Sequence, residues 1–133
     1  MIDIRNKVLT TLTLSLEEKF PDIVIQSPYE ATSPKFPCVT FEEISNSTDI
    51  NSLDSAGEFA SNISYEINIF TFGNKSQTNC LKIRNEIDNV MNTQLGMLRT
   101  SSSKVVNYAD TSIFRWVLRY SCTVDKHNTI FRG

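Results

Sequence analysis

The chain has 133 residues, of which 40% are hydrophobic and 21% are charged, and its formal net charge is −2 at pH 7. This length suits a single domain, residues 1–133, with a sizeable core and no room for a second. The composition is ordinary for a soluble globular protein, and a pI near 5.4 argues against free nucleic-acid binding. Because the sequence shows neither a secretory signal nor an apolar run of about 18 residues, we expect an intracellular protein without a membrane partner.

The first predicted element is a helix over residues 4–20, where an apolar residue recurs at every fourth position. Leu12, Leu14 and Leu16 also alternate with polar residues, as in a strand, but the length of the repeat favours a helix. Pro21 ends this helix because proline cannot continue the hydrogen-bond pattern.

A second helix is predicted to begin near Asn74, with Gln77 three residues later at capping-box spacing, and to end at Gly96. Its apolar face holds Cys80, Ile83, Ile87, Val90 and Met91. Its polar face, which we expect in solvent, holds Lys82, Asn85, Glu86, Asn89 and Asn92.

Alternating apolar and polar residues predict strands over residues 38–45 and 62–72, and a short apolar segment precedes them at 23–25. A ribbon over residues 97–107 and 112–126 follows the second helix. The 15 residues of its last strand would span roughly 50 Å, so this strand must bend or protrude. One face of that strand holds Phe114, Trp116, Leu118, Tyr120, Cys122 and Val124, and the other holds Arg115, Arg119, Ser121 and Thr123.

These elements predict an α+β domain. We expect an antiparallel sheet of four or more strands, with two helices packed on one face and a long loop between the early strands. That loop is the stretch SNSTDINSLDSAGEFAS, residues 45–61, which is much longer than a hairpin needs.

The composition of the loop favours contact with a partner. Its acidic residues are Asp49, Asp54 and Glu58, and it contains no lysine or arginine. Ile50, Leu53 and Phe59 make it too apolar for a purely solubilising linker. We expect it to order against a partner with these three side chains as anchors, and a disordered excursion without function is the alternative.

The sequence predicts no catalytic, cofactor-binding or metal site. His127 is the only histidine, and nothing at a recognisable spacing makes it part of a nucleophilic pair. Cys38, Cys80 and Cys122 lack the spacing of a zinc site, so we expect buried, reduced thiols. The carboxylate pair at 42–43 is expected on the solvated surface, and no glycine-rich phosphate loop is present. We therefore expect a protein that is not an enzyme.

Charge is divided unevenly along the chain. Residues 1–95 hold 7 Lys/Arg and 13 Asp/Glu, a net of −6, whereas residues 96–133 hold 6 Lys/Arg and 2 Asp/Glu, a net of +4. A molecule with an acidic and a basic part can bind copies of itself head-to-tail, and such a contact closes into a ring at the right rotation. The alternative is an uneven distribution without consequence.

Other candidate interface residues lie near the C-terminus. Arg115 and Arg119 are predicted partners for acidic groups of a neighbour, and a solvated outer strand face is the alternative. Phe131 and Arg132 lie in a tail with little else to bury, so we expect them to dock on a partner. With the loop, the predicted interface residues are Ile50, Leu53, Asp54, Glu58, Phe59, Arg115, Arg119, Phe131 and Arg132.

Two segments carry a resemblance to a known family. The first, YEINIFTFGNKSQTNCLKIRNEIDNVMNTQLGMLRT, combines a strand, a helix and a short LGM-R element. The second, ADTSIFRWVLRYSCTVDKHNTIFR, joins an aspartate and I-x-R to an aromatic-rich strand that ends in V-D-x-x-x-x-I-F-R. With the N-terminal helix they cover nearly the whole chain, which resembles the tail-terminator or tail-completion proteins of tailed bacteriophages.

The resemblance implies a subunit, similar to lambda-type tail terminators, that forms a hexameric ring on the last ring of the tail tube. There it would stop tube polymerisation and bind neck or head-completion proteins, and also the sheath protein if the tail is contractile. The genome would pass through the lumen with transient, non-specific contact. The implied location is the tail–neck junction of the virion, after synthesis in the host cytoplasm. Family members have a long loop that is mobile in the free subunit and ordered in the ring, which residues 45–61 would match.

Two other classes stay open. One is a neck or head-completion ring protein of the same phage, which would have similar size and symmetry. The other is a ferredoxin-like module that binds a small ligand, although nothing in the sequence converges on a ligand. Such a module would ordinarily be a dimer. For this chain we expect a monomer or weak association, with six-fold rings when it is concentrated or mixed with tail tubes.

Overall fold

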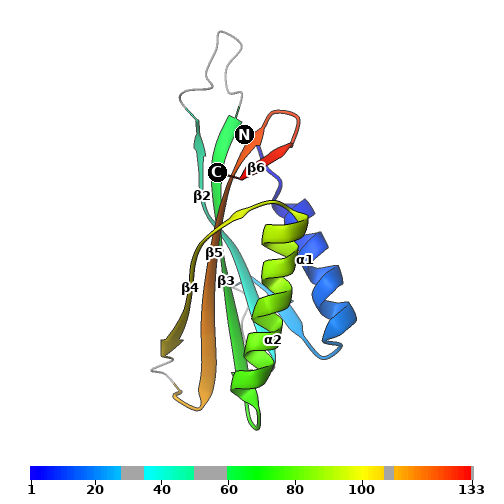
Figure 1. The fold of residues 1–133 in the computed structure, drawn as a ribbon, viewed down its shortest axis with the longest axis vertical. Coiled ribbons are helices and arrows are strands. Elements are labelled where there is room, and N and C mark those ends of the chain that lie inside the picture. The colour runs from blue at the N-terminus through cyan, green and yellow to red at the C-terminus, as the bar shows by residue number, and fades with distance from the viewer. Residues whose placement is uncertain (28–34, 50–59, 107–109, 133) are drawn as a thin grey trace.

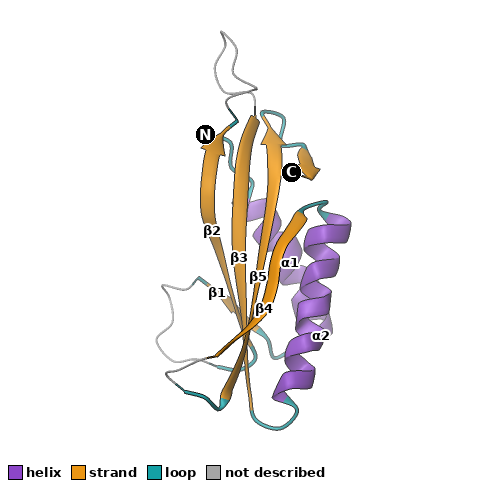
Figure 2. Ribbon diagram, turned by 60° about the vertical axis from the view of Figure 1, so that its left-hand side comes forward, coloured by secondary structure: helices purple, strands orange, loops and turns teal. Residues whose placement is uncertain are grey.

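The computed structural model describes residues 1–27, 35–49, 60–106 and 110–132. Along the chain its elements are α1 (Arg5–Lys19), β1 (Val24–Gln26), β2 (Cys38–Thr48), β3 (Ala60–Phe72), α2 (Ser76–Asp88), the π-helical segment η3 (Asn89–Gln94), β4 (Leu98–Val106), β5 (Ile113–Asp125) and β6 (Ile130–Arg132). Both helices lie against the same face of one twisted sheet (Figures 1 and 2). The expected α+β class, with two helices on one face of a largely antiparallel sheet, is confirmed.

The sheet is organised around its two longest strands. Its order is β1-β2-β3-β5-β4, and β3 pairs with β5 from Ala60 opposite Asp125 to Phe72 opposite Ile113. Because β3 occupies one side of β5 over that whole length, β4 and β6 share the other side. All these pairs are antiparallel, whereas β1 runs parallel to β2.

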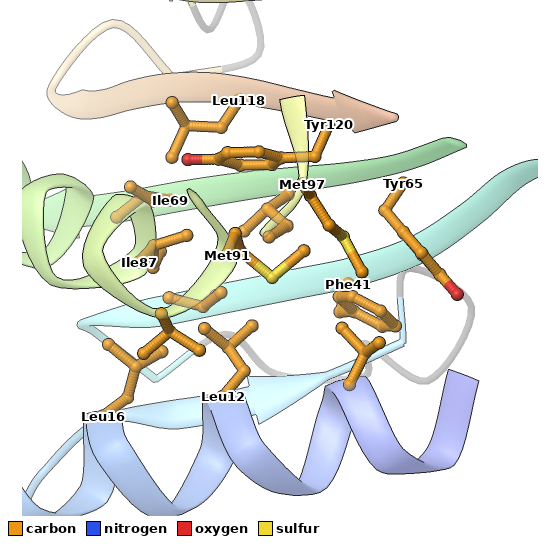
Figure 3. Close-up of a cluster of buried hydrophobic side chains, with 14 of the residues drawn as sticks. Leu12, Leu16, Phe41, Tyr65, Ile69, Ile87, Met91, Met97, Leu118 and Tyr120 are labelled. Atoms are coloured by element: carbon orange, nitrogen blue, oxygen red, sulfur yellow. The ribbon is translucent and has the colours of Figure 1, made fainter. Parts of the chain in front are cut away.

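The core lies between the sheet and the helices. Val8, Leu12 and Leu16 of α1 are fully buried, which confirms the predicted apolar stripe. Figure 3 shows Leu12 and Leu16 reaching toward Ile87, Met91 and the strands. Each such side chain contributes about 1.5–3 kcal/mol when it leaves water, so this layer supplies much of the stability.

The three thiols belong to this buried layer. Cys38, Cys80 and Cys122 are buried and unpaired. Burial raises the pKa of Cys80 to about 11 and the pKa of Cys122 to about 11, so both thiols stay protonated at neutral pH. The prediction of buried, reduced cysteines is confirmed.

The early hairpin is longer than predicted. β2 continues to Thr48 and β3 begins at Ala60, so both ends of the predicted loop 45–61 are strand. Asn46 lies opposite Ile63, Thr48 lies opposite Ser61, and the pairing needs backbone groups only. Residues 45–48 of β2 are all polar, so they show no alternation of apolar and polar residues that would have predicted this part of the strand.

The C-terminal residues are also strand. Phe131 and Arg132, predicted to lie in a tail, belong to β6, which pairs with β5 at residues 122–124. The chain reverses through Asn128, whose φ of +63° is left-handed, and Ile130 packs partly against the core. The Arg132 guanidinium donates a hydrogen bond to the carbonyl oxygen of Asn92 at 2.7 Å. The prediction that these residues lie in a tail is therefore wrong, because strand pairing and this hydrogen bond hold them in the sheet. Their docking on a partner stays a prediction.

The second helix begins later than predicted. It starts at Ser76, after a turn in which Gly73 has a φ of +92° and Lys75 a φ of +59°. No side chain caps its first turn, so the predicted capping box from Asn74 to Gln77 is absent. Gly96, with a φ of +71°, directs the chain from η3 toward β4, as expected for a glycine that ends a helix.

Glu86 joins the two helices, although its place on the polar side of α2 predicted exposure to solvent. Only 9% of the residue is exposed. The Ser15 hydroxyl donates to Glu86 Oε1 at 2.6 Å, and Lys19 Nζ lies 2.8 Å from Glu86 Oε2. Burial by itself raises the pKa of Glu86, but the hydrogen bonds from Lys19 and Ser15 outweigh it and lower the pKa. The prediction of a solvated Glu86 is wrong because α1 covers this part of α2.

We predict that Glu86→Gln destabilises the fold at neutral pH and removes part of its acid sensitivity. The folded-state pKa lies below the unfolded value of about 4.3, so the ionised group stabilises the fold above that value. This contribution disappears as the pH falls through the folded-state pKa. Urea unfolding should show a loss of about 1–2 kcal/mol at pH 7, because Lys19 is half exposed and part of its charge is screened.

The same loss should shrink as the pH falls through the folded-state pKa of Glu86, because the wild-type carboxyl then becomes uncharged like the glutamine. Glu17→Gln, at an exposed position of α1, is the control and should change stability by less than about 0.5 kcal/mol. A Glu86→Gln protein that keeps the wild-type pH dependence would contradict this role.

Candidate interaction surface

One face of the sheet, here called the open face, has no described helix against it (Figure 2). Side chains alternate along a strand, so the burial of Leu118 and Tyr120 beneath the helices directs Arg115 and Arg119 to the open face. The predicted division of the last strand, with apolar residues on one side and arginines on the other, is confirmed. The interaction of these arginines with a neighbour stays a prediction.

A chain of polar contacts crosses the open face from β3 to β5. Arg119 lies opposite Glu66, with 3.4 Å between the guanidinium and Glu66 Oε2. Asn68 Nδ2 donates to Glu66 Oε1 at 3.2 Å. Arg115 donates to Asn68 Oδ1 twice, from Nε at 3.0 Å and from a terminal nitrogen at 2.7 Å, and lies 5.4 Å from the centroid of the Phe70 ring. Arg115 is thus held firmly within its own chain, whereas Arg119 is held loosely and its side chain is 52% exposed.

The division of charge along the chain becomes a division across the width of the sheet. Strands β1, β2 and β3 carry Glu42, Glu43 and Glu66 and no basic residue. Strands β4, β5 and β6 carry Arg99, Lys104, Arg115, Arg119 and Arg132, with Asp125 as their acidic residue. Because β1-β2-β3 forms one half of the sheet and β5-β4 with β6 forms the other, one half is acidic and the opposite half is basic.

Glu43 lies on β2, on the helix side of the sheet opposite Tyr65. Its Oε1 is buried and has no hydrogen-bond partner among the described residues. Burial, followed by the nearby Asp3 carboxylate, raises the pKa of Glu43, while Arg5 and a hydrogen bond with Asn46 lower it less. The prediction of full solvation at this position is wrong, because the N-terminal segment packs beside this strand.

A second charged group on the helix side ties β4 and β5 to α2. The Arg84 guanidinium lies 4.7 Å from the centroid of the Trp116 ring. One helical turn later, Asp88 Oδ1 accepts a hydrogen bond from the Tyr120 hydroxyl at 2.8 Å and lies 3.0 Å from Arg99. Sequence analysis missed this group, and the spacing of Arg84 and Asp88 on one helical side is the signal that could have found it.

The described part of the chain offers few features of a metal site, a ligand pocket or a membrane span. Among the residues placed there, no three His, Cys, Asp or Glu side chains lie together as a metal site would require. A hollow of about 290 Å³ lies between the end of α1 and β3, and Phe20, Phe36, Thr71 and Phe72 line it with Lys19. A search of the described helices finds none with the length and apolar character of a membrane span.

The predicted loop anchors Ile50, Leu53, Asp54, Glu58 and Phe59 lie outside the described residues. The two ends that flank them are placed, because the Asp49 N–H donates to the Ala60 carbonyl oxygen at 3.0 Å. Asp49 and Ala60 therefore mark the described tip of the β2–β3 hairpin. Phe131, another predicted interface residue, is 52% exposed on β6, at the same end of β5 as this tip.

Comparison with known proteins assigns no family. No protein-family model matches the chain, and a search of curated proteins finds no match. The fold, the distribution of charge and the two segments quoted above are therefore the basis for a function.

We predict different roles in stability for the two arginines of the open face. Asn68 is only 7% exposed, so Arg115→Met leaves a nearly buried amide oxygen without its donor and should cost about 1–3 kcal/mol of unfolding free energy. Arg119→Met removes one exposed ion pair and should cost less than about 1 kcal/mol. The two substitutions are matched controls for each other in urea unfolding, and equal losses would contradict the contacts described here.

Proposed function

We propose that this chain is a structural subunit of a bacteriophage tail. Copies of it would form a six-fold ring that caps the tail tube, ends tube polymerisation and offers a docking surface to the neck. The observation that carries the proposal is the division of charge between the two halves of the sheet.

Opposite charges on opposite sides of a subunit favour head-to-tail contact between identical copies. In that contact the acidic side of one copy meets the basic side of the next, and each copy keeps its other side free for a further neighbour. Such a series closes into a ring when the rotation per copy divides a full turn. Electrostatic complementarity would select the orientation and speed the encounter, and buried contacts would hold it.

The positions of the segments that resemble tail terminators support the same function. The first segment forms most of β3 with α2, η3 and the start of β4, and the second forms β5 and β6. Since β3 and β5 pair along their full length, the two segments make up one contiguous part of the fold. The resemblance therefore falls on a spatial unit and not on scattered residues.

The proposed activity needs shape and charge rather than catalysis. A ring that binds the end of a tube and presents a different surface on its far side removes the site at which the next tube ring would add. Passage of the genome through the lumen needs only transient contact, and the net charge of −2 disfavours tight binding to phosphate.

The decisive experiment is tube growth in the presence of the purified chain. Tail-tube protein encoded by the same phage genome would be polymerised with and without it and examined by electron microscopy. We expect shorter tubes with a ring at one end, and light scattering should show the free chain as a monomer or weak oligomer. Tubes that grow uncapped at saturating chain contradict the proposal, and binding to a neck complex without capping favours a neck protein.

We predict that Phe131→Ser weakens capping while the fold is retained. The side chain is half exposed on β6, so its loss should change stability little but remove about 1–2 kcal/mol of apolar contact with a partner, or roughly 5- to 30-fold in affinity. Leu14→Ser, at a side chain that is 65% exposed on α1, is the matched control and should cap normally. Equal capping by both variants would exclude Phe131 from the interface.

A further inference from the structure

Both lateral edges of the sheet are open over several residues. On one edge β1 covers only residues 38–40 of β2, so residues 41–48 have a single strand neighbour, β3, in the described chain. On the other edge β5 is the one strand that the described residues place beside β4. The free N–H and C=O groups of an edge strand are a template on which another strand can pair.

The strand directions suit head-to-tail pairing of these two edges. β2, β3, β5 and β4 alternate in direction across the sheet, so the first and the last of the four run opposite ways. A second copy in the same orientation, placed beside β4, brings its β2 antiparallel to that strand. The alternation of the sheet then continues from one copy into the next.

The two edges also carry opposite charge. β2 contains Glu42 and Glu43 and no basic residue, whereas β4 contains Arg99 and Lys104 and no acidic residue. No ion pair within 4.0 Å joins Glu43 or Lys104 to another described residue. Arg99 is paired with Asp88, but its side chain remains 46% exposed.

The register of the sheet shows which side chains would meet. Glu43 pairs with Tyr65, Tyr65 with Tyr120, and Tyr120 with Arg99, so these four residues form one row of paired residues across the sheet. Glu43 and Arg99 are the two ends of this row, and both side chains lie on the helix side. Without an offset along the strands, Glu43 of one copy would lie beside Arg99 of the next. An offset of four rows, which keeps the faces aligned, would place Glu43 beside Lys104 instead.

We propose that copies of this chain join by antiparallel pairing of β2 in one copy with β4 in the next, with Glu43 beside Arg99 or Lys104. This inference rests on the proposed function, whose ring requires a head-to-tail contact, and it adds where that contact lies and which residues make it. In a closed ring built in this way the edges of β2 and β4 are paired with each other, which removes their tendency to aggregate.

The bulges in both edge strands bear on the same pairing. One lies between Glu43 and Ser45 in β2 and the other between Arg99 and Ser101 in β4. A bulge at an edge ordinarily discourages unwanted strands, because it bends the strand and disrupts its ladder. The β2 bulge lies on one side of the row that contains Glu43 and Arg99, and the β4 bulge lies on the other side of that row. A second copy of this chain would therefore bring a strand with a matching bend, which a regular strand would lack.

Cysteine cross-linking tests the pairing. Ser45 pairs with Ser64, Ser64 with Ser121, and Ser121 with Leu98, so Ser45 and Leu98 are the two ends of another row. Both are exposed. Ser45→Cys and Leu98→Cys proteins would be purified separately, mixed at high concentration and mildly oxidised, while the native thiols remain buried. We expect severalfold more covalent dimer in the mixture than in either protein alone, and less dimer at high salt because the charges are screened.

A Ser45→Cys and Ser103→Cys mixture tests the register offset by four rows, since Ser103 lies four rows from Leu98 on β4. Leu14→Cys mixed with Leu98→Cys is the matched control, because Leu14 is exposed on α1 and should give no dimer above background. Dimers formed equally well by Ser45→Cys alone would overturn the head-to-tail arrangement.

The outcomes separate this inference from the proposed function. Rings that form on tubes while both mixtures fail to cross-link overturn the edge pairing and leave tube capping in place. Head-to-tail dimers from a protein that never caps tubes retain the edge pairing and overturn the tail function. A protein that neither cross-links nor caps overturns both.

Discussion

The antiparallel pairing of β3 with β5 is the contact on which the rest of the structure depends. It extends from Ala60 to Phe72 on one strand and from Asp125 to Ile113 on the other. Tyr65 and Tyr120 meet on the helix side of this pair, and Glu66 and Arg119 meet on the open face. A slip of one residue would turn every buried side chain of one strand toward the open face, so burial on a single side fixes the register.

The helices depend on this register more than on their own sequences. Several threonines make α1 a weak helix in isolation, and its stability comes from the stripe that it buries on the strands. α2 is fixed in its C-terminal half, by Arg84 and Asp88 against the strands and by Glu86 against α1. A nearly buried carboxylate between two helices is stable only when donors surround it, and Ser15 and Lys19 supply them.

The sequence predicted those parts of the fold in which one side of an element is buried. Burial imposes a period of two on β5 and of about four on α1, and both periods are visible in the residues. It could not predict β6 or the far end of the β2–β3 hairpin, because strand pairing between backbone groups leaves no such period. The place of Arg115 followed from alternation, but its acceptor, Asn68, depends on which strand lies beside β5. Glu86 was misplaced for a related reason, since α1 reaches it from 67 to 71 residues away in the chain.

Topology converts a division of charge along the chain into a division across the molecule. The acidic strands come before α2 and the basic strands after it, and β5 pairs directly with β3, which leaves β4 at the outer edge. Had β4 paired with β3 instead, Arg99 and Lys104 would lie in the interior of the sheet and β5 would form its outer edge. Charges separated by more than about 8 Å are largely screened at physiological salt, so this arrangement can orient a neighbour but cannot hold it alone. Unpaired backbone groups on the same two edges supply the short-range contact that screening does not weaken, and for that reason charge and strand pairing are expected at the same place.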